Sequence, residues 1–438
     1  MLLALRLNQI FSFGNLKKNQ MRKIIASLFP LLLLSIISFA QNPCGTYLTP
    51  QWKNQLNQYH LQQPTTAPIN RSIYQLPIQF HIVGDDNGIG YYSLTELFEL
   101  LCELNEKYAP VGFHFFMNDL PQYINNSLYY QHDFANGDAM MSQYNYPDAI
   151  NVYIVADPAG YCGYYTYGMD AISVAILCNH TGSTTLAHEL GHYFSLPHPF
   201  DEVNGITEFV DGSNCTTGGD LFCDTRADFL NNRWACPYLG NQTDPHGDLY
   251  DPDSSLYMSY SLDQCQNRFS DEQITAMIYD VQNIRPNLWQ TANPNNDSTS
   301  AVTLIQPFDN SINVTNSAAT LAWHKSTGAT YYHLIVSKYG NFQYPNVNLI
   351  TTDTTFTCFL PPSTKWHWMV RPFNFGNTCT PYSNAWNFQT SVSTDVIDLS
   401  DNSIQLNTNL ITAGQKIVVK STSKSFKTIS VFNVEVGV

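Results

Sequence analysis

Along residues 71–290, apolar positions recur with the periods of strands and helices. The segment YQLPIQFHIVG, residues 74–84, is rich in apolar side chains and predicts a strand. In SLTELFELLCELNEKY, residues 93–108, the apolar spacing is helical, with Ser93 as the N-cap and Glu96 as its capping-box partner. Three strand-like runs follow, at residues 111–117, 149–157 and 171–177. This order of elements predicts a mixed α/β (α+β) domain.

The end of this domain is predicted at a second change of pattern. The chain is rich in loop-forming residues after His198, and residues 270–284 then predict a helix that Ser270 caps and Pro286 ends. Residues 291–300, TANPNNDSTS, have the composition of a linker.

The remainder of the chain predicts β structure. Residues 301–392 alternate aromatic and polar positions between turn residues, which predicts an all-β sandwich. Residues 393–438 predict part of another β unit. At the other end, residues 41–70 are polar and lack sustained periodicity, as a pro-segment or a linker would.

The first forty residues are typical of a secretory signal peptide. A basic start at Met21 precedes a short apolar run, Ile24–Phe39, and a small residue, Ala40. A membrane anchor is the alternative, but the run is short for a span and contains Pro30. Met21 is a second candidate start for the protein. The sequence therefore predicts a secreted or cell-surface protein without a transmembrane anchor.

Length and charge narrow the function classes. A chain of 438 residues is too long for one ordinary domain. Its net charge of −15, with only 20 lysines and arginines, argues against binding to nucleic acid or to anionic lipid.

The ten cysteines permit full pairing in an oxidising compartment. Their grouping predicts local bridges among Cys215, Cys223, Cys236 and Cys265, and one between Cys358 and Cys379. A thiolate zinc cluster is the alternative, although no close CxxC pair supports it.

The segment TTLAHELGHYFSLPHPF, residues 184–200, carries the strongest chemical signal. His188 and His192 share one face of a helix, where two imidazoles can reach one ion. His198 can join them only if the helix ends near Ser195, and Pro197 favours such an end. Three histidines leave the fourth zinc position to water, and Glu189 can then act as general base and acid. The alternatives are ordinary histidines on an amphipathic helix, or a structural zinc site.

These residues resemble a known family. HELGHYFSLPH resembles the HExxHxxGxxH signature of the metzincin metallopeptidases, and SLYMSYS resembles their Met-turn. The surrounding sequence, over about residues 44–286, is most similar to the cytophagalysin or pappalysin family. The resemblance implies that His188, His192 and His198 bind zinc, that Glu189 is the base and acid, and that Met258 lies beneath the metal.

The same resemblance implies roles for other residues. Tyr260, after the Met-turn, would stand near the metal and stabilise the oxyanion, although a buried structural aromatic is an equal alternative. Asp224 and Thr225 resemble a calcium-carrying loop, whose alternative is a solvated acidic loop. Some relatives prefer a basic residue after the scissile bond, and Asp263 would line such a pocket.

Two residues raise the question of whether the site is active. Cys44, in NPCGT, resembles the cysteine switch of related pro-enzymes, in which a thiolate occupies the fourth zinc position; a disulfide with Cys102 is the alternative. Ser195 stands where the signature has glycine, at a turn that needs a left-handed backbone, which costs a residue with a Cβ atom about 1 kcal/mol.

The C-terminal segments also resemble known modules. Trp323, the Tyr331–Tyr332 strand and WHWMVRPFN resemble a fibronectin type III domain. Residues 393–438 resemble the start of the sorting domain that directs proteins of Bacteroidetes through type IX secretion, although an ordinary β module would look similar.

Together these observations predict a secreted, zinc-dependent endopeptidase that hydrolyses peptide bonds in proteins with a zinc-activated water. Its partners would be protein or peptide substrates, and secretion machinery through the C-terminus. The alternative is a catalytically inactive metzincin scaffold that serves as a secreted binding protein or adhesin, which the serine at position 195 favours.

Overall fold

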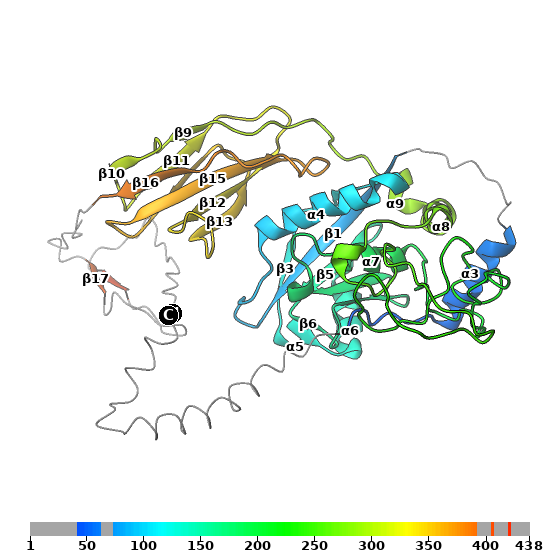
Figure 1. Ribbon diagram of the computed structural model, residues 1–438. Coiled ribbons are helices and arrows are strands. Elements are labelled where there is room, and N and C mark those ends of the chain that lie inside the picture. The colour runs from blue at the N-terminus through cyan, green and yellow to red at the C-terminus, as the bar shows by residue number, and fades with distance from the viewer. Residues whose placement is uncertain (1–41, 63–72, 392–403, 407–418, 422–438) are drawn as a thin grey trace, which may run out of the picture. The chain divides into compact units, whose positions relative to one another are not determined.

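The computed structural model describes residues 42–62, 73–391, 404–406 and 419–421, and the chain divides into two compact units, residues 1–292 and 293–438 (Figure 1). The predicted signal peptide, and the predicted sorting segment apart from two short strands, lie outside the described residues. Within the described part, no helix combines the length and the apolar character needed to cross a bilayer.

The first unit is built on a six-stranded sheet. Its order is β2-β1-β5-β8-β7, with β3 also pairing with β1. All pairs are parallel except β7 with β8, so β7 forms an antiparallel edge. The strands are β1 (Tyr74–Gly84), β2 (Phe113–Met117), β3 (Gln122–Asn125), β5 (Ile150–Val155), β7 (Gly163–Thr166) and β8 (Ala171–Ala175). The free side of β7 is the edge beside which the candidate site lies.

Helices pack on this sheet through their apolar stripes. Helix α4 (Leu94–Tyr108) buries Leu97, Leu101 and Leu104, which follow the helical period, and packs against β2. Its Tyr108 hydroxyl donates to the Ala187 carbonyl at 2.9 Å, which joins α4 to α7 (Thr185–Tyr193). The unit also contains α5 (Ser127–Tyr130), α6 (Phe134–Tyr144), α8 (Asp271–Asn283) and α9 (Asn287–Gln290), and β4 (Gln131–His132) pairs with β6 (Asp157–Pro158). The predicted mixed α/β class is confirmed.

The two predicted helix caps differ in outcome. Ser270 and Gln273 form a full capping box at the start of α8. Ser93 precedes α4 with an extended backbone, but its side chain makes no capping bond, so the capping box predicted with Glu96 is wrong.

Helix α3 (Pro50–Gln62) was not predicted. It lies in the segment whose polar composition indicated a pro-segment or linker without regular structure. Only Trp52, Leu56 and Tyr59 are buried, at a spacing of four and three residues. Three apolar positions in a polar stretch give a weak periodic signal, which explains the omission.

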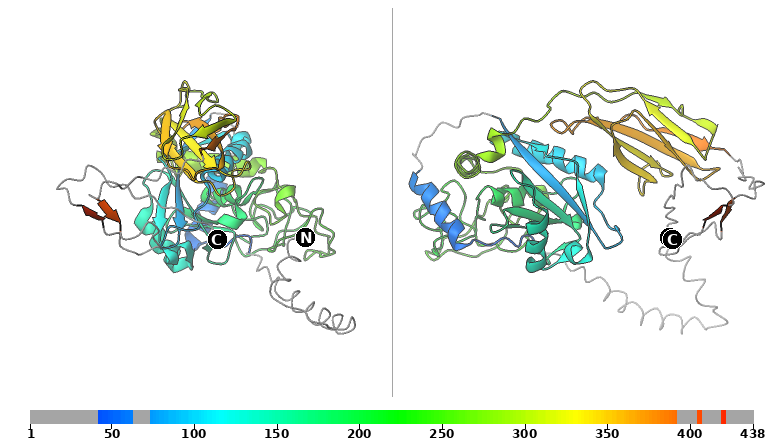
Figure 2. Two further views of the ribbon diagram at one scale, coloured as in Figure 1. Left: turned by 90° about the vertical axis from the view of Figure 1, so that its left-hand side faces the viewer. Right: turned by 180° about the vertical axis from the view of Figure 1, so that it is seen from behind.

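The described residues of the second unit are all β, as predicted. One sheet has the order β10-β16-β15-β12-β13 and the other β14-β11-β9, and Figure 2 shows them from two further sides. Trp323, Trp366, Trp368 and Tyr332 are fully buried in its core. Its strands are β9 (Leu304–Gln306), β10 (Ser311–Val314), β11 (Ala319–Trp323), β12 (Tyr331–Ser337), β13 (Val347–Thr351), β14 (Thr355–Cys358), β15 (Lys365–Phe373) and β16 (Trp386–Thr390), followed by the antiparallel pair β17 (Ile404–Leu406) and β18 (Val419–Ser421).

The cysteine pairing is partly as predicted. Local bridges Cys215–Cys223 and Cys236–Cys265 are confirmed, and Cys162–Cys178 joins the start of β7 to the end of β8. Cys358 is free, so its predicted bridge to Cys379 is wrong. Cys44 is also free, which excludes the alternative bridge to Cys102.

Candidate metal centre

Helix α7 ends where the sequence predicted. The Ser195 amide donates to the His192 carbonyl and the Leu196 amide to the Gly191 carbonyl, both at 2.9 Å. This pair of bonds is a Schellman motif, and Ser195 takes its left-handed position with φ 71°. The chain therefore turns back beside its own helix and carries His198 toward the helix face.

The serine at this turn makes contacts that glycine could not. The Ser195 hydroxyl donates to the buried Asp280 carboxylate and accepts from Gln55 Nε2 at 2.6 Å. The backbone carbonyl of Ser195, which a glycine would also have, accepts from Trp52 Nε1 at 3.3 Å. Asp280 is also ion-paired with Arg285 at 2.6 Å. The hydroxyl thus links the turn to α8 and to α3, which offsets the strain of the left-handed backbone.

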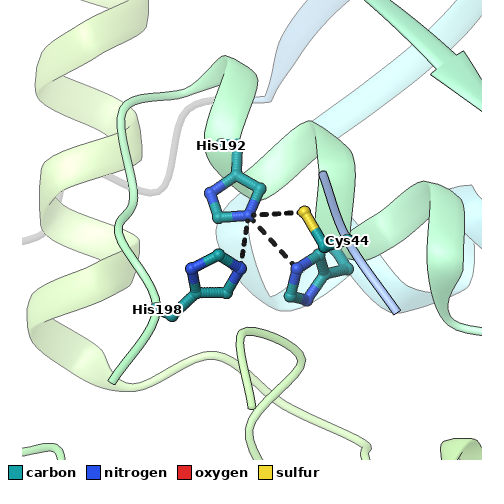
Figure 3. A group of neighbouring side chains, drawn as sticks. Cys44, His192 and His198 are labelled. Atoms are coloured by element: carbon teal, nitrogen blue, oxygen red, sulfur yellow. Dashed lines mark hydrogen bonds between the residues drawn. The ribbon is translucent and has the colours of Figure 1, made fainter. Parts of the chain in front are cut away.

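Three histidine nitrogens converge at one buried point. His192 Nε2 lies 3.1 Å from His188 Nε2 and 3.0 Å from His198 Nε2. Figure 3 shows the rings of His192 and His198 and the sulfur of Cys44 directed toward one another, with Cys44 Sγ 3.5 Å from His192 Nε2. All four ligand atoms lie within 4.8 Å of one another.

The outer nitrogens of these rings fix their tautomers. His188 Nδ1 donates to the Tyr257 carbonyl and His192 Nδ1 to the Leu196 carbonyl, each at 2.7 Å, because a carbonyl can only accept. His198 Nδ1 lies 2.9 Å from Asp201 Oδ2. In the neutral ring each Nε2 is then left with a bare lone pair.

The donor set fits a divalent cation. Lone pairs at 3.0–3.1 Å cannot hydrogen-bond to one another, so only a proton or a metal ion between them relieves their repulsion. Burial, and then the neighbouring His198, lower the pKa values of His188 and His192 well below the usual range. Protonation is therefore unfavourable, and neutral imidazoles suit zinc.

Glu189 lies beside the cluster with one oxygen uncommitted. Its Oε2 accepts from Thr46 Oγ1 at 3.0 Å and from Cys44 Sγ at 3.5 Å. Its buried Oε1 has no hydrogen-bond partner among the described residues. Burial raises the pKa of Glu189 to about 8. Such a carboxyl group can exchange a proton near neutral pH.

Met258 packs on helix α7, and Tyr260 packs on the histidine cluster. A Cβ atom on Gly191 would lie 2.3 Å from Met258 Sδ, so the methionine presses directly on helix α7. The Tyr260 ring meets the His198 ring edge-on at 4.9 Å, and its hydroxyl donates to the Cys44 carbonyl at 3.3 Å. Burial and the nearby Cys44 and Glu189 raise the pKa of Tyr260, which keeps its hydroxyl a donor.

Cys44 is held at the site by pairing along the sheet edge. The Cys162 amide donates to the Asn42 carbonyl at 2.8 Å, and the Gly45 amide to the Gly163 carbonyl at 2.9 Å. A Cβ atom on Gly45 would lie 2.8 Å from the Tyr161 ring, so only glycine permits this approach. Residues 42–46 therefore lie along the start of β7, parallel to it.

The two predicted calcium residues, Asp224 and Thr225, differ in burial and in hydrogen-bond partners. Asp224 is exposed and accepts from the Glu272 amide at 2.8 Å, whereas Thr225 is buried and donates to Asp220 at 3.0 Å. Sequence reasoning missed Asp220 and Glu208, two buried carboxylates. Burial, and to a lesser extent the charge of Glu208, raises the pKa of Asp220 well above its usual range. Glu208 Oε2 has no partner among the described residues, and burial raises the pKa of Glu208 to about 8. Their only sequence signal was an acidic side chain in a loop.

Comparisons with known proteins agree with a peptidase. No family model matches the chain. It is 27% identical over 222 residues to an extracellular metalloprotease of Colletotrichum graminicola, covering 46% of this chain and 74% of that protein. It is 29% identical over 231 residues to extracellular metalloprotease 1 of Coccidioides posadasii, covering 48% and 76%. These relatives support a metalloprotease. Among solved structures, Tannerella forsythia mature mirolysin in complex with a cleaved peptide is similar at 18% identity, with a TM-score of 0.40 and coverage of 50% and 96%.

The contacts of Ser195 predict an order of stability for two substitutions. Ser195→Gly removes the hydroxyl and the strain together, whereas Ser195→Ala removes the hydroxyl and keeps the strain. We expect Ser195→Gly to lower the free energy of unfolding by about 1–2 kcal/mol, because a hydrogen bond to a buried carboxylate is lost. The free energy of unfolding of Ser195→Ala should be about 1 kcal/mol lower still, because alanine keeps the strain of the left-handed backbone. Denaturant unfolding checks the order, and an alanine variant as stable as the glycine variant would contradict it.

Proposed function

We propose that this protein is a secreted zinc-dependent endopeptidase of the metzincin class, similar to the cytophagalysin or pappalysin family, that hydrolyses peptide bonds in proteins. The observation that carries the proposal is the convergence of three neutral histidine nitrogens beside the uncommitted oxygen of Glu189. The extracellular metalloproteases to which the chain is similar support the same activity.

In this proposal His188, His192 and His198 hold the zinc ion. When bound, zinc supplies Lewis-acid chemistry, lowering the pKa of a water molecule toward about 7 and polarising a peptide carbonyl. Asp201 and the two backbone carbonyls keep the rings oriented. Met258 forms the apolar floor beneath the helix and limits movement of His192.

Glu189 and Tyr260 act on the reacting groups. Glu189 accepts the proton of the attacking water and returns it to the nitrogen of the leaving amine. Tyr260 donates a hydrogen bond to the carbonyl oxygen as negative charge develops on it. Its bond to the Cys44 carbonyl supports this role, because a peptide carbonyl is the group that a substrate would present.

The alternative, an inactive scaffold acting as a binding protein or adhesin, rested on Ser195. The Schellman bonds are intact with serine in place, so this departure does not prevent the ring of His198 from reaching the others. We therefore favour the enzyme. Residues 301–392 are proposed to be a fibronectin type III-like module, and residues 393–438 a partial sorting segment used in secretion.

Replacement of Glu189 tests whether the protein is an active enzyme or an inactive scaffold. Glu189→Gln keeps the shape of the side chain but cannot accept the proton, so we expect zinc content to be retained and casein hydrolysis to fall about 100-fold to 10,000-fold. Both are measured in a protein that also carries Cys44→Ser, so that the thiol of Cys44 cannot block the site and mask the effect. Near-parental turnover would exclude Glu189 as the base, and an inactive background protein that binds zinc would favour the scaffold.

We further propose that Cys44 keeps the enzyme latent. Its sulfur lies where a fourth ligand would stand, and its free thiol is directed at the histidines rather than into a disulfide. Burial and Glu189 raise the pKa of the thiol, so the thiolate needs a cation nearby. A thiolate on zinc would exclude the water that Glu189 must deprotonate.

The latency proposal predicts activation by Cys44→Ser. Removal of the sulfur frees the fourth position, so we expect the initial rate of casein hydrolysis to rise at least about tenfold over the parent chain. Cys358→Ser, at the other free cysteine in the described part of the chain, is the matched control and should leave the rate unchanged. Equal initial rates for the two variants would contradict the switch.

For calcium we favour the buried carboxylates Glu208 and Asp220 over the exposed Asp224. We propose that Glu208, Asp220 and Thr225 supply oxygen ligands to calcium, because the charge of Glu208 disfavours ionisation of the buried Asp220 and a bound cation would offset that cost. A Cβ atom on Gly219 would meet Glu208 Oε2 at 2.4 Å, so the backbone of Gly219 packs against the uncommitted oxygen.

Calcium should therefore stabilise the zinc-loaded protein. At a calcium concentration one hundred times Kd, the expected gain in the free energy of unfolding is about 2.7 kcal/mol. Glu208→Gln should abolish the gain, whereas Asp224→Asn should keep it. Thermal melts with added calcium, and with magnesium as the ion control, check this. If Asp224→Asn loses the stabilisation by calcium and Glu208→Gln keeps it, Asp224 in the exposed loop would be the ligand instead.

A further inference from the structure

Helix α3 holds the segment that carries Cys44 against the metal-site turn and against α8. Near the start of the helix, Trp52 Nε1 donates to the Ser195 carbonyl at 3.3 Å. Toward its end, the ring of the buried Tyr59 meets the Tyr279 ring of α8 edge-on at 5.1 Å. These contacts are made by side chains of α3, so a change that weakens the packing of the helix also loosens the chain that leads to Cys44.

His60, near the end of this helix, is enclosed by aromatic rings. Its ring meets the Tyr59 ring at 4.8 Å and the Phe222 ring at 5.2 Å, both edge-on. Its Nε2 is buried and has no hydrogen-bond partner in the described part of the chain. In a neutral imidazole this nitrogen can be the bare lone pair, but a protonated ring carries an N–H on both nitrogens. One N–H would then be buried without an acceptor, which is unfavourable.

The carboxylates around His60 are engaged elsewhere. The titratable groups on the elements packed against it are Tyr59 of α3, Asp220 and Asp224 beside Phe222, and Glu272 and Tyr279 of α8. Among the described residues, none of them forms a hydrogen bond or an ion pair with His60. The carboxylates accept from backbone amides instead, which are those of Glu272 at 2.8 Å for Asp224, Cys223 at 2.7 Å for Glu272 and Phe222 at 3.0 Å for Asp220.

The docked position of α3 is therefore sensitive to mild acid. Burial lowers the pKa of His60 to about 4, from an ordinary value of 6.5. Release of the helix exposes the ring to water and restores the ordinary value. Because the pKa is lower in the docked state, His60 favours docking fully above about pH 6.5, and this contribution is lost as the pH falls toward about 4.

We infer that protonation of His60 releases helix α3, so that mild acid opens the latent site. The inference rests on the proposed peptidase and on its latency through Cys44, and it names the regulation of that site. The proton comes from solvent, and no covalent bond changes. Once α3 leaves, residues 42–46 keep their short pairing with β7 and the contacts of Cys44 and Thr46, but lose the anchor that Trp52 supplied.

Hydrogen exchange of residues 50–62 tests the inference on the full, zinc-loaded chain. Exchange is followed by mass spectrometry at about pH 7.5 and about pH 5, with correction for the intrinsic effect of pH. We expect the opening constant of α3 to rise about tenfold at the lower pH, because only the released ring is readily protonated. In His60→Gln, which stays neutral, the rise should be below about twofold. His180→Gln, at an exposed histidine, is the matched control and should behave as the parent.

The thiol of Cys44 reports whether the site opens with the helix. In a chain that also carries Cys358→Ser, no other free cysteine remains among the described residues. At about pH 5, this thiol should react with a disulfide reagent about tenfold faster with His60 present than in His60→Gln, and comparison at one pH cancels the intrinsic reactivity of the thiol. Equal rates would overturn the inference that release of α3 opens the site.

An opening constant that does not change with pH in the parent, or that rises equally in a folded His60→Gln variant, would also overturn the inference. His60→Phe, which is neutral and suits the aromatic contact, replaces the glutamine variant if that variant does not fold. Hydrogen exchange does not depend on peptide hydrolysis. A Cys44→Ser chain that cleaves no casein would therefore overturn the proposed function, while the exchange result would still decide whether His60 controls α3.

Discussion

The left-handed turn at Ser195 is the constraint on which the site depends. His188 and His192 are placed by helical spacing alone, but His198 reaches them only because helix α7 stops and the chain reverses. The hydroxyl of Ser195 ties this turn to Asp280, and Asp280 is ion-paired with Arg285. The backbone conformation of Ser195 is thus held by side chains distant in sequence, Asp280 and Arg285. These contacts also fix the position of His198, which follows the turn.

The edge of the sheet is the second element that organises the site. Strand β7 is antiparallel to β8 and, among the described residues, no further strand of the sheet lies beyond it, so its outer backbone groups are available for pairing. Gly163 brings this backbone against Glu189, since a Cβ atom there would lie 2.9 Å from Glu189 Oε1. The same edge therefore positions the carboxylate and accepts residues 42–46.

The sequence predicted what short-range spacing determines. The two helical histidines, the helix end and the strand β1 all follow from periodicity or from residues within one turn of each other. It could not predict that the hydroxyl of Ser195 meets Asp280, 85 residues away, because that contact depends on tertiary packing. Nor could it place His60 against Phe222, a contact that depends on how helix α3 packs.

The direction of residues 42–46 decides which groups hold them. They run parallel to β7, and parallel pairing is slightly weaker per residue than antiparallel pairing. Few backbone bonds are made, so side chains carry more of the attachment of the N-terminal segment: Cys44 at the histidines, and Trp52 of helix α3, whose indole meets the His192 ring edge-on at 5.8 Å. Attachment of the N-terminal segment and the proposed zinc site therefore share His192, so a change in the ligands of that proposed site would also change how the N-terminal segment is held.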